Sequence, residues 1–167
     1  RLLSETDDLT GVYNMRGFAI VADRLFSQAV RYNRPVSLLM IDSDNLKAVN
    51  DLHGHEAGNQ LLKLVAKYIE TELRHTDVLA RYGGDEFVAL LPEAPGARAL
   101  EVAQRIIDSI ATDPLEFEGK RIDTSVSIGL ASYPDDGRSL DAVQGRADRA
   151  MYRAKEQGRN RVVKFTT

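Results

Sequence analysis

The feature that most constrains the fold is a short apolar run that ends abruptly in acidic residues. Residues 36–41 read Val-Ser-Leu-Leu-Met-Ile and are followed directly by Asp42, Ser43 and Asp44. A run of this length with almost no polar residue predicts a strand buried on both faces, because a strand with one wet face alternates apolar and polar residues. We therefore expect a central strand that delivers two carboxylates to its end.

Apolar residues at helical spacing predict four helices around this strand. They cover residues 18–29, 61–73, 100–110 and 140–154. The first helix should end near Pro35, which disfavours helix in the residue before it, and the last near Gly158. The polar, glycine-containing residues 50–58 predict a connection that leads into the second helix.

Further strands are predicted by apolar runs and alternation. Residues 78–82 and 87–91 flank Gly83-Gly84-Asp85-Glu86, the pattern of a hairpin with a short, exposed glycine turn. Residues 126–130 alternate polar and apolar side chains, which favours a half-buried strand, and residues 161–165 form a short last strand. The order of elements predicts an α+β sheet with antiparallel pairing and helices packed over it.

Composition sets the class of protein. A chain of 167 residues that is 43% hydrophobic favours one globular domain. It has no cysteine and no apolar run near 18 residues, so neither a disulfide scaffold nor a membrane span is supported, and we expect a cytoplasmic setting. The net charge of −3 argues against a surface that follows nucleic acid, which needs a basic excess.

The start of the chain suggests an upstream segment. Arg1, Leu2 and Leu3 are consistent with the tail of an arriving helix, so we expect the C-terminal part of a longer protein. Whether that upstream region tethers the domain to the inner membrane stays open.

The acidic residues are candidates for a metal site. Asp42 and Asp44 at a strand end, with Asp85 and Glu86 on a tight turn, offer the oxygen ligands that Mg²⁺ needs together with substrate phosphates. An isolated Asp-x-Asp is more often a solvated turn, but the glycines before Asp85 let a ligand approach the backbone. A zinc site is not favoured, because the chain's histidines have neither cysteine partners nor a second histidine four residues on; they are His53, His55 and His75.

The full word in residues 81–87, Arg-Tyr-Gly-Gly-Asp-Glu-Phe, resembles the signature of the GGDEF family of diguanylate cyclases. Further blocks match the family in order and spacing, at residues 7–14, 39–44, 47–55 and 147–160. The resemblance implies a single domain over residues 1–167 with the GGDEF, or nucleotidyl-cyclase, fold. That fold is a ferredoxin-like palm with a central, mostly antiparallel sheet flanked by helices.

The resemblance also implies a reaction and its residues. Two GTP molecules would be condensed to cyclic di-GMP and two pyrophosphates, with two Mg²⁺ or Mn²⁺ ions per active site. Counterparts of Asp42, Asp85 and the Ser43 carbonyl hold metal in the family. The counterpart of Glu86 assists deprotonation of the ribose 3′-hydroxyl or shares the second metal, and that of Arg81 stabilises developing charge. Substrate-binding counterparts are Asn45, Leu46, Lys47, Asn50, Asp51, Asn59, Lys155 and Arg159.

Three alternatives remain beside this assignment. Lys155 and Arg159 could instead complement the dipole of a helix end. The domain could also be a non-catalytic receptor for GTP or cyclic di-GMP, or be inert without its upstream region, although the intact turn favours an enzyme. Because one domain holds one triphosphate, turnover implies a homodimer, with an upstream sensory domain as a further partner.

Asn59 departs from the family pattern. It falls where the family usually has an aspartate that reads the guanine edge alongside Asn50. An amide offers a donor that opposes guanine N1–H, yet it can pair with the N1 acceptor and 6-amino donor of adenine. We hypothesise relaxed base selectivity, with ATP accepted beside GTP and mixed cyclic GMP-AMP as a product. Asn59 is also a candidate to cap the start of a helix, a role that is compatible with base reading.

An inhibitory product site is the last implied feature. Arg74 and Asp77 form an Arg-x-x-Asp element shortly before the glycine turn, with Arg105 as a companion. An arginine fork and a carboxylate suit a guanine edge, so cyclic dinucleotide is the expected ligand. An ordinary surface ion pair is the alternative.

Overall fold

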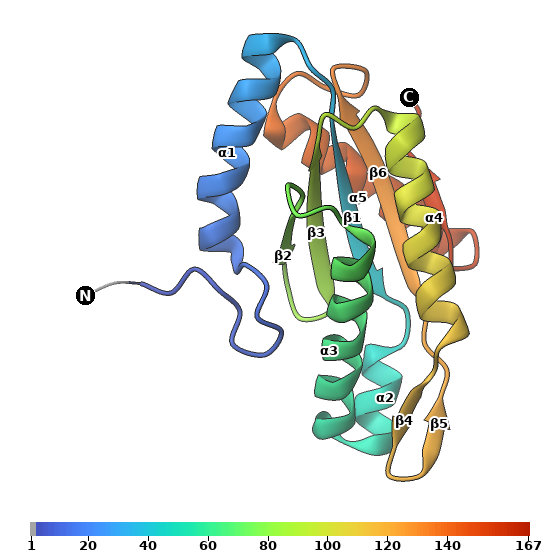
Figure 1. Cartoon of the computed structure of the whole chain (residues 1–167). Coiled ribbons are helices and arrows are strands. Elements are labelled where there is room, and N and C mark those ends of the chain that lie inside the picture. The colour runs from blue at the N-terminus through green and yellow to red at the C-terminus, as the bar shows by residue number, and fades with distance from the viewer. Residues whose placement is uncertain (1–2) are drawn as a thin grey trace.

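The protein is described by a computed structural model that covers residues 3–167, and it forms an α+β fold as expected (Figure 1). A five-stranded sheet has the order β2-β3-β1-β6-β7, antiparallel except for the β6–β7 pair. Its strands are β1 (Val36–Ser43), β2 (Val78–Arg81), β3 (Glu86–Pro92), β6 (Val126–Tyr133) and β7 (Val162–Lys164). The helices are α1 (Met15–Tyr32), α2 (Leu46–His53), α3 (His55–Glu72), α4 (Gly96–Thr112) and α5 (Leu140–Glu156).

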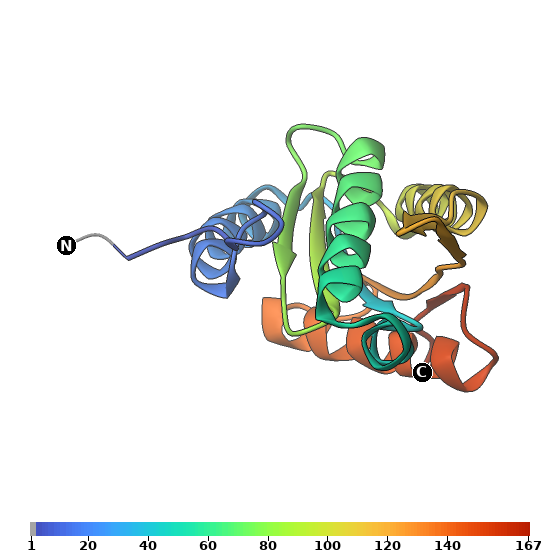
Figure 2. The ribbon, with the colours of Figure 1, turned by 90° about the horizontal axis from the view of Figure 1, so that it is seen from below.

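The sheet is covered on both faces, which explains the continuous apolar run of β1. Leu38 and Met40 pack in a core with α1 and α5, whereas Leu39 and Ile41 pack in a second core with α3 and α4. Viewed from below, α5 lies along one face, and α3 and α4 lie along the other (Figure 2). By the same alternation, Asp42 at the end of β1 belongs to the face that α5 covers.

The segment before α1 is attached to the free edge of β2. Tyr13 forms a parallel bridge with Ala80; its amide donates to the Leu79 carbonyl at 3.2 Å, and its carbonyl accepts from the Arg81 amide at 2.9 Å. Asn14 then caps α1 by accepting from the Gly17 amide. The N-terminal segment is thereby fixed next to the residues that lead into the glycine turn.

The structure corrects the sequence predictions in three places. Residues 50–58 are not an irregular connection, because they belong to the end of α2, the Gly54 break and the first turn of α3. A small hairpin of β4 (Leu115–Phe117) and β5 (Lys120–Ile122) was not predicted. Strand β6 is buried along its whole length rather than half-buried.

Small residues explain the burial of β6. A side chain at Gly129 would overlap the backbone of α5 at Ala147 and Met151, so the helix sits directly on the strand. Polar positions of β6 are buried with hydrogen-bond partners, as for Ser132, whose hydroxyl lies 2.7 Å from that of Ser37. The alternation of polar and apolar residues in β6 therefore does not mark a solvent-exposed face, because other elements cover both faces of the strand.

Two expectations concern the N-terminus and the membrane. The predicted helix tail falls on Arg1 and Leu2, which lie outside the described residues, and on Leu3, which is exposed and outside regular structure. Within residues 3–167, the helices are all too short or too polar to cross a bilayer.

Candidate active site

Backbone pairing brings the acidic residues of the strand and the turn together. In the antiparallel register of β1 and β3, Asp42 lies directly opposite Glu86, and the Ser43 amide donates to the Asp85 carbonyl at 3.1 Å. Residues opposite each other on antiparallel strands share a face and have neighbouring side chains. The strand end and the glycine turn therefore present their carboxylates to one place.

These acids lie in a cleft of about 830 Å³ that also holds most of the predicted substrate-binding residues. One wall comes from the start of α2, and the other from the end of α5 and the residues just beyond it. The predicted residues that line the cleft are Asp42, Ser43, Asn45, Leu46, Lys47, Asp51, Asp85, Glu86, Lys155 and Arg159. A second hollow, of about 740 Å³, lies between α1 and the start of β2 and holds none of the acids of the turn.

Asp42 is held in an environment that disfavours its charge. Burial raises its pKa to about 7; Lys155 opposes the shift, while Asp85 and Glu86 add to it. Its Oδ1 atom is buried and has no hydrogen-bond partner among the described residues. Burial likewise raises the pKa of Glu86, aided by Asp148 and Asp85. Six acidic side chains line the cleft and only three basic ones, so its acids outnumber its cations.

Asp44, two residues away, is in the opposite situation. Its carboxylate accepts from the hydroxyls of Ser125 and Ser127, both at 2.6 Å, from the Asn160 amide at 3.0 Å and from Lys155 Nζ at 2.9 Å. Burial would raise its pKa, but the two serines and Lys155 lower it below the ordinary value. Asp44 fastens β1 to β6 and to the loop after α5, and it has no oxygen left for a metal.

Lys155 lies between the two aspartates. Its ammonium is 3.2 Å from Asp42 Oδ2 and 2.9 Å from Asp44 Oδ1, and it donates to the Ser43 carbonyl at 3.0 Å. The side chain is only 17% exposed. The charge therefore sits inside the acidic cluster, which is more than the dipole of a helix end would require.

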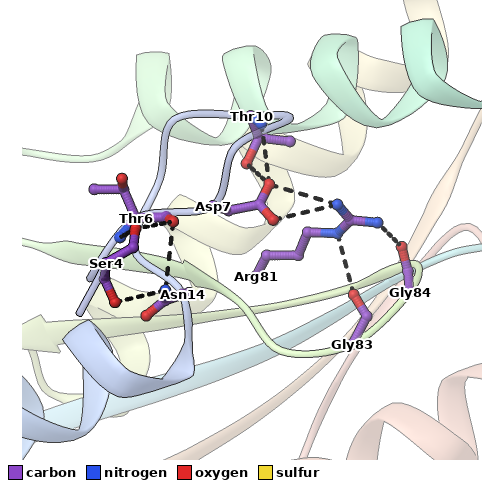
Figure 3. Close-up of polar contacts among 8 residues, drawn as sticks. All are labelled: Ser4, Thr6, Asp7, Thr10, Asn14, Arg81, Gly83 and Gly84. Atoms are coloured by element: carbon purple, nitrogen blue, oxygen red, sulfur yellow. Dashed lines mark hydrogen bonds and ion pairs between the residues drawn. The ribbon is translucent and has the colours of Figure 1, made fainter.

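Arg81 supports the glycine turn (Figure 3). Its guanidinium donates to the Gly83 carbonyl at 3.2 Å and to the Gly84 carbonyl at 2.7 Å, and it forms an ion pair with Asp7 at 3.4 Å. Burial would raise the pKa of Asp7, but hydrogen bonds from the amide and hydroxyl of Thr10, together with Arg81, lower it. In this geometry Arg81 positions the turn that carries Asp85 and Glu86.

The donor atoms of the cleft fit a magnesium site that a nucleotide completes. Among residues 3–167, His, Cys, Asp and Glu side chains nowhere form a group of three that would hold an ion alone. Mg²⁺ commonly binds one or two carboxylates and takes its other ligands from phosphates and water. The unpaired Oδ1 of Asp42 beside the Ser43 carbonyl, with Asp85 and Glu86 opposite, supplies that partial set.

Comparisons with known proteins agree with this geometry. The family model described as "Diguanylate cyclase, GGDEF domain" matches residues 4–161. The chain belongs to the GGDEF family. Among curated relatives, Diguanylate cyclase A of Treponema denticola is 43% identical over 76% of this chain and 34% of its own length. Response regulator PleD of Caulobacter vibrioides is 37% identical over 96% of this chain and 36% of its own.

Solved structures confirm the GGDEF fold. The GGDEF domain of TpbB (YfiN) from Pseudomonas aeruginosa superposes with a TM-score of 0.92 at 39% identity, covering 96% of this chain and 94% of that one. The GGDEF domain of DgcB from Caulobacter crescentus, in complex with c-di-GMP, superposes with a TM-score of 0.91 at 30% identity. The match covers 98% of this chain and 97% of that one. The chain thus spans whole GGDEF domains but only about a third of the two curated relatives named above.

The predicted base-reading residues of this GGDEF domain, Asn50 and Asn59, lie on α2 and α3. They are not among the residues that line the cleft. Asn50 Oδ1 is buried without a partner among the described residues, and a side chain at Gly58 would overlap that atom. The capping interpretation of Asn59 is wrong, because α3 begins at His55 with Gly54 as its N-cap. Asn59 therefore lies inside the helix, next to the glycine that Asn50 faces.

Two of the predicted inhibitory residues of the GGDEF domain, Arg74 and Asp77, bind each other. Arg74 pairs with Asp77 at 3.3 Å and donates to the Pro92 carbonyl at 2.8 Å, while Asp77 also accepts from the Arg74 amide. The Asp77 side chain is 2% exposed. Arg105, on α4, instead pairs with Glu72 of α3 at 3.5 Å. The structure joins Arg74 to Asp77 but gives Arg105 a separate partner.

Sequence reasoning missed the residues that hold the site in shape. Asp44 was grouped with the metal acids, and Ser125, Ser127 and Asn160 were given no role. The polar alternation of residues 125–127 was the available signal, since a hydroxyl in a strand covered on both sides needs an acceptor.

Proposed function

We propose that this GGDEF domain condenses two GTP molecules into cyclic di-GMP and two pyrophosphates. The observation that carries the proposal is the uncompensated negative charge of the cleft, where Asp42 has a raised pKa and a buried, unpaired oxygen. Lysine and arginine side chains line the same cleft. A triphosphate with its bound cations therefore matches it, because the cations suit the carboxylates and the phosphates suit the basic side chains.

The residues of the cleft have separable roles in this proposal. Asp42, Asp85, Glu86 and the Ser43 carbonyl would hold two divalent ions, Mg²⁺ or Mn²⁺. Bound divalent ions polarise the α-phosphate and favour the departure of pyrophosphate. Lys47, Lys155 and Arg159 would neutralise the triphosphate, with Asn45, Leu46 and Asp51 as the wall beside it.

Glu86 is suited to accept the proton of the ribose 3′-hydroxyl. Burial, Asp148 and Asp85 raise its pKa, and a general base works best when its pKa approaches the operating pH. The carboxylate lies opposite Asp42 in the sheet, so the proton acceptor and the proposed metal ligand belong to the same cluster.

The product contains two nucleotides, so the reaction needs two domains. Each cleft would present one triphosphate, and each 3′-hydroxyl would attack the α-phosphate held by the other copy. We therefore propose a homodimer in which residues 1–167 are the single catalytic domain of a longer protein. An upstream sensory domain would control the approach of the two copies, in the cytoplasm where GTP is supplied.

Pyrophosphate release against protein concentration tests the proposal. With GTP and Mg²⁺, the specific rate should rise with concentration, because only facing pairs turn over. A rate of zero at every concentration, with GTP bound, would instead identify a receptor. Asp85→Asn serves as the inactive control, since the fold of the turn needs its backbone rather than its carboxylate.

Base selectivity is a second part of the proposal. The Asn59 amide beside Gly58 and Asn50 supports acceptance of ATP beside GTP, for the hydrogen-bonding reason given above. Losing one partner on guanine costs about 1–3 kcal/mol, enough to change the product ratio. Incubation with equal GTP and ATP should give mixed cyclic GMP-AMP beside cyclic di-GMP. The Asn59→Asp variant should return to cyclic di-GMP alone; wild-type protein that makes only cyclic di-GMP would remove the idea.

A further inference from the structure

The ammonium of Lys155 occupies the position of a bound cation. It lies within 3.2 Å of three oxygens, which are Asp42 Oδ2, Asp44 Oδ1 and the Ser43 carbonyl. Two of these groups, the Asp42 carboxylate and the Ser43 carbonyl, are the ones that the proposed function assigns to a divalent ion. Under the proposed function, the same oxygens would bind two cations of different kinds.

The two aspartates depend on Lys155 to different degrees. Asp44 has two serine hydroxyls and the Asn160 amide as further donors, so its charge is stabilised without the lysine. For Asp42, the cation within ion-pair distance among the described residues is Lys155, whose ammonium lies 3.2 Å from Oδ2. The ammonium is therefore the main compensation for Asp42 in the free domain.

A lysine is chemically suited to exchange with a metal. Its charge is a compact point at the end of four flexible methylenes, so it can leave one anion for another without movement of the helix. Lys155 lies in the last turn of α5 and lines the cleft together with Lys47 and Arg159. A triphosphate in that cleft would offer the ammonium a new anion close to its present place.

We propose that Lys155 is an internal counter-ion that blocks the metal oxygens until a nucleotide arrives. In the free domain its ammonium competes with divalent ions for Asp42 and Ser43. When a metal–triphosphate complex enters, the phosphates take the ammonium and the oxygens become available. Metal and nucleotide therefore bind as one complex, and free metal binds poorly. The inference rests on the proposed function, because it uses the same oxygens.

Binding of Mn²⁺ alone tests the inference without any turnover. Free Mn²⁺ is counted from its electron paramagnetic resonance signal in titrations of wild-type protein, Lys155→Met and Lys47→Met. Lys47 is the matched control, because it is an exposed lysine of the same cleft that is outside the ion pairs of the described residues. We expect Lys155→Met to bind Mn²⁺ at least about tenfold more tightly than wild type, equal to about 1.4 kcal/mol. Lys47→Met should change the affinity less than about threefold, since an exposed charge is screened.

Two results would overturn the counter-ion role. One is an unchanged or weaker Mn²⁺ affinity in Lys155→Met whose thermal unfolding remains cooperative. The other is an equal gain in both lysine variants, which would reflect net charge alone. Failure of the proposed function looks different: wild-type protein would then bind no more Mn²⁺ with a non-hydrolysable GTP analogue than without it, and Asp42→Asn would bind as wild type does.

A measurement on the wild-type protein covers the case in which Lys155→Met does not fold. The ¹⁵N resonance of the Lys155 ammonium should be visible in the free domain, because hydrogen bonds to three oxygens slow its exchange with water. It should keep its position when Mg²⁺ alone is added and move when Mg²⁺ and the GTP analogue are added together. A shift with Mg²⁺ alone, or none with both, would contradict the exchange.

Discussion

The acidic cleft and the turn at residues 74–77, here called the Arg74 turn, both lie at strand ends, yet their charged side chains differ in whether they have partners. In the cleft, Asp42 keeps a buried oxygen without a partner among the described residues, and its pKa is raised. In the turn, Arg74 and Asp77 satisfy each other, and Arg74 also binds a backbone carbonyl. Both were predicted as ligand sites from sequence motifs, but only the cleft has charge that its own residues leave uncompensated.

The difference teaches how a motif can be weighed. Buried polar groups in folded proteins nearly always have partners, so an unpaired one marks a place for a water molecule, an ion or a ligand. Two side chains that bind each other carry no such indication, because the pair contributes to the fold whether or not a ligand binds. The following changes test whether this contrast separates function from structure.

The largest effect should come from removing the charge of Asp42, whose Oδ1 atom has no partner among the described residues. Asp42→Asn keeps the shape of the residue but loses the charge that would hold a divalent ion, so we expect pyrophosphate release to fall about a thousandfold. Asp23→Asn, the same change at an exposed position of α1, should alter the rate less than about twofold. Activity of Asp42→Asn within about tenfold of wild type would contradict the functional role of the cleft.

The same substitution should make the metal-free protein more stable at alkaline pH. The pKa of Asp42 is about 7 when folded and has the ordinary value of 3.8 when unfolded, so the stability from its protonation is fully present below the unfolded pKa and lost as pH rises through the folded one. The asparagine mimics the neutral carboxyl, and we expect Asp42→Asn to gain about 1–3 kcal/mol at about pH 8 in urea unfolding. The gain should vanish near the unfolded pKa. If the unfolding free energies of the two proteins instead changed with pH in parallel, the charge of Asp42 would be fully stabilised by its surroundings.

The next effect concerns the support of the glycine turn. Asp7→Asn removes the charge that orients Arg81, so the turn loosens and kcat should fall about tenfold with little change in KM. Asp7→Asn and Arg81→Met should couple in a double-mutant cycle by about 1–2 kcal/mol. Additive effects, with Arg81→Met far worse than Asp7→Asn, would instead support a direct role of Arg81 in catalysis.

Arg34→Met is the control for that pair. Arg34 and Glu93 form an ion pair whose side chains are 59% and 62% exposed, and exposed pairs contribute little. Loss of this pair should leave kcat unchanged, which would separate a positioned guanidinium from surface charge in general.

The smallest effect should come from changing the Arg74 turn, where Arg74 and Asp77 already bind each other. Arg74→Ala loses hydrogen bonds to Asp77 and the Pro92 carbonyl, which should cost about 1 kcal/mol in unfolding free energy. If the turn also binds product, inhibition by cyclic di-GMP should weaken at least about tenfold in this variant. An unchanged inhibition constant would leave Arg74 with its structural role alone and would sharpen the contrast with the cleft.

The elements that sequence predicted well are those with one dominant signal. The run at residues 36–41 gave β1, and the glycine turn between two apolar runs gave the β2–β3 hairpin. Helix α2 was missed because eight residues offer too little periodicity, and the Gly54 break looks like a loop. The burial of β6 depended on Gly129, whose close approach to α5 is a tertiary fact.

The candidate site was predictable in its members but not in their partners. Asp42 and Asp44 look alike in sequence, and only the hydroxyls of Ser125 and Ser127 distinguish them. Arg81 adjoins the glycine turn in sequence, but its ion pair joins it to Asp7, far away along the chain. Such contacts depend on strand register and helix placement, which local patterns do not specify.

The most direct test of the account is a crystal structure of the domain with Mg²⁺ and a non-hydrolysable GTP analogue. The account predicts an ion bound to Asp42 and the Ser43 carbonyl, with the triphosphate in the same cleft and the Lys155 ammonium on a phosphate oxygen. A nucleotide bound elsewhere, or Lys155 still on Asp42 with no ion beside it, would contradict it.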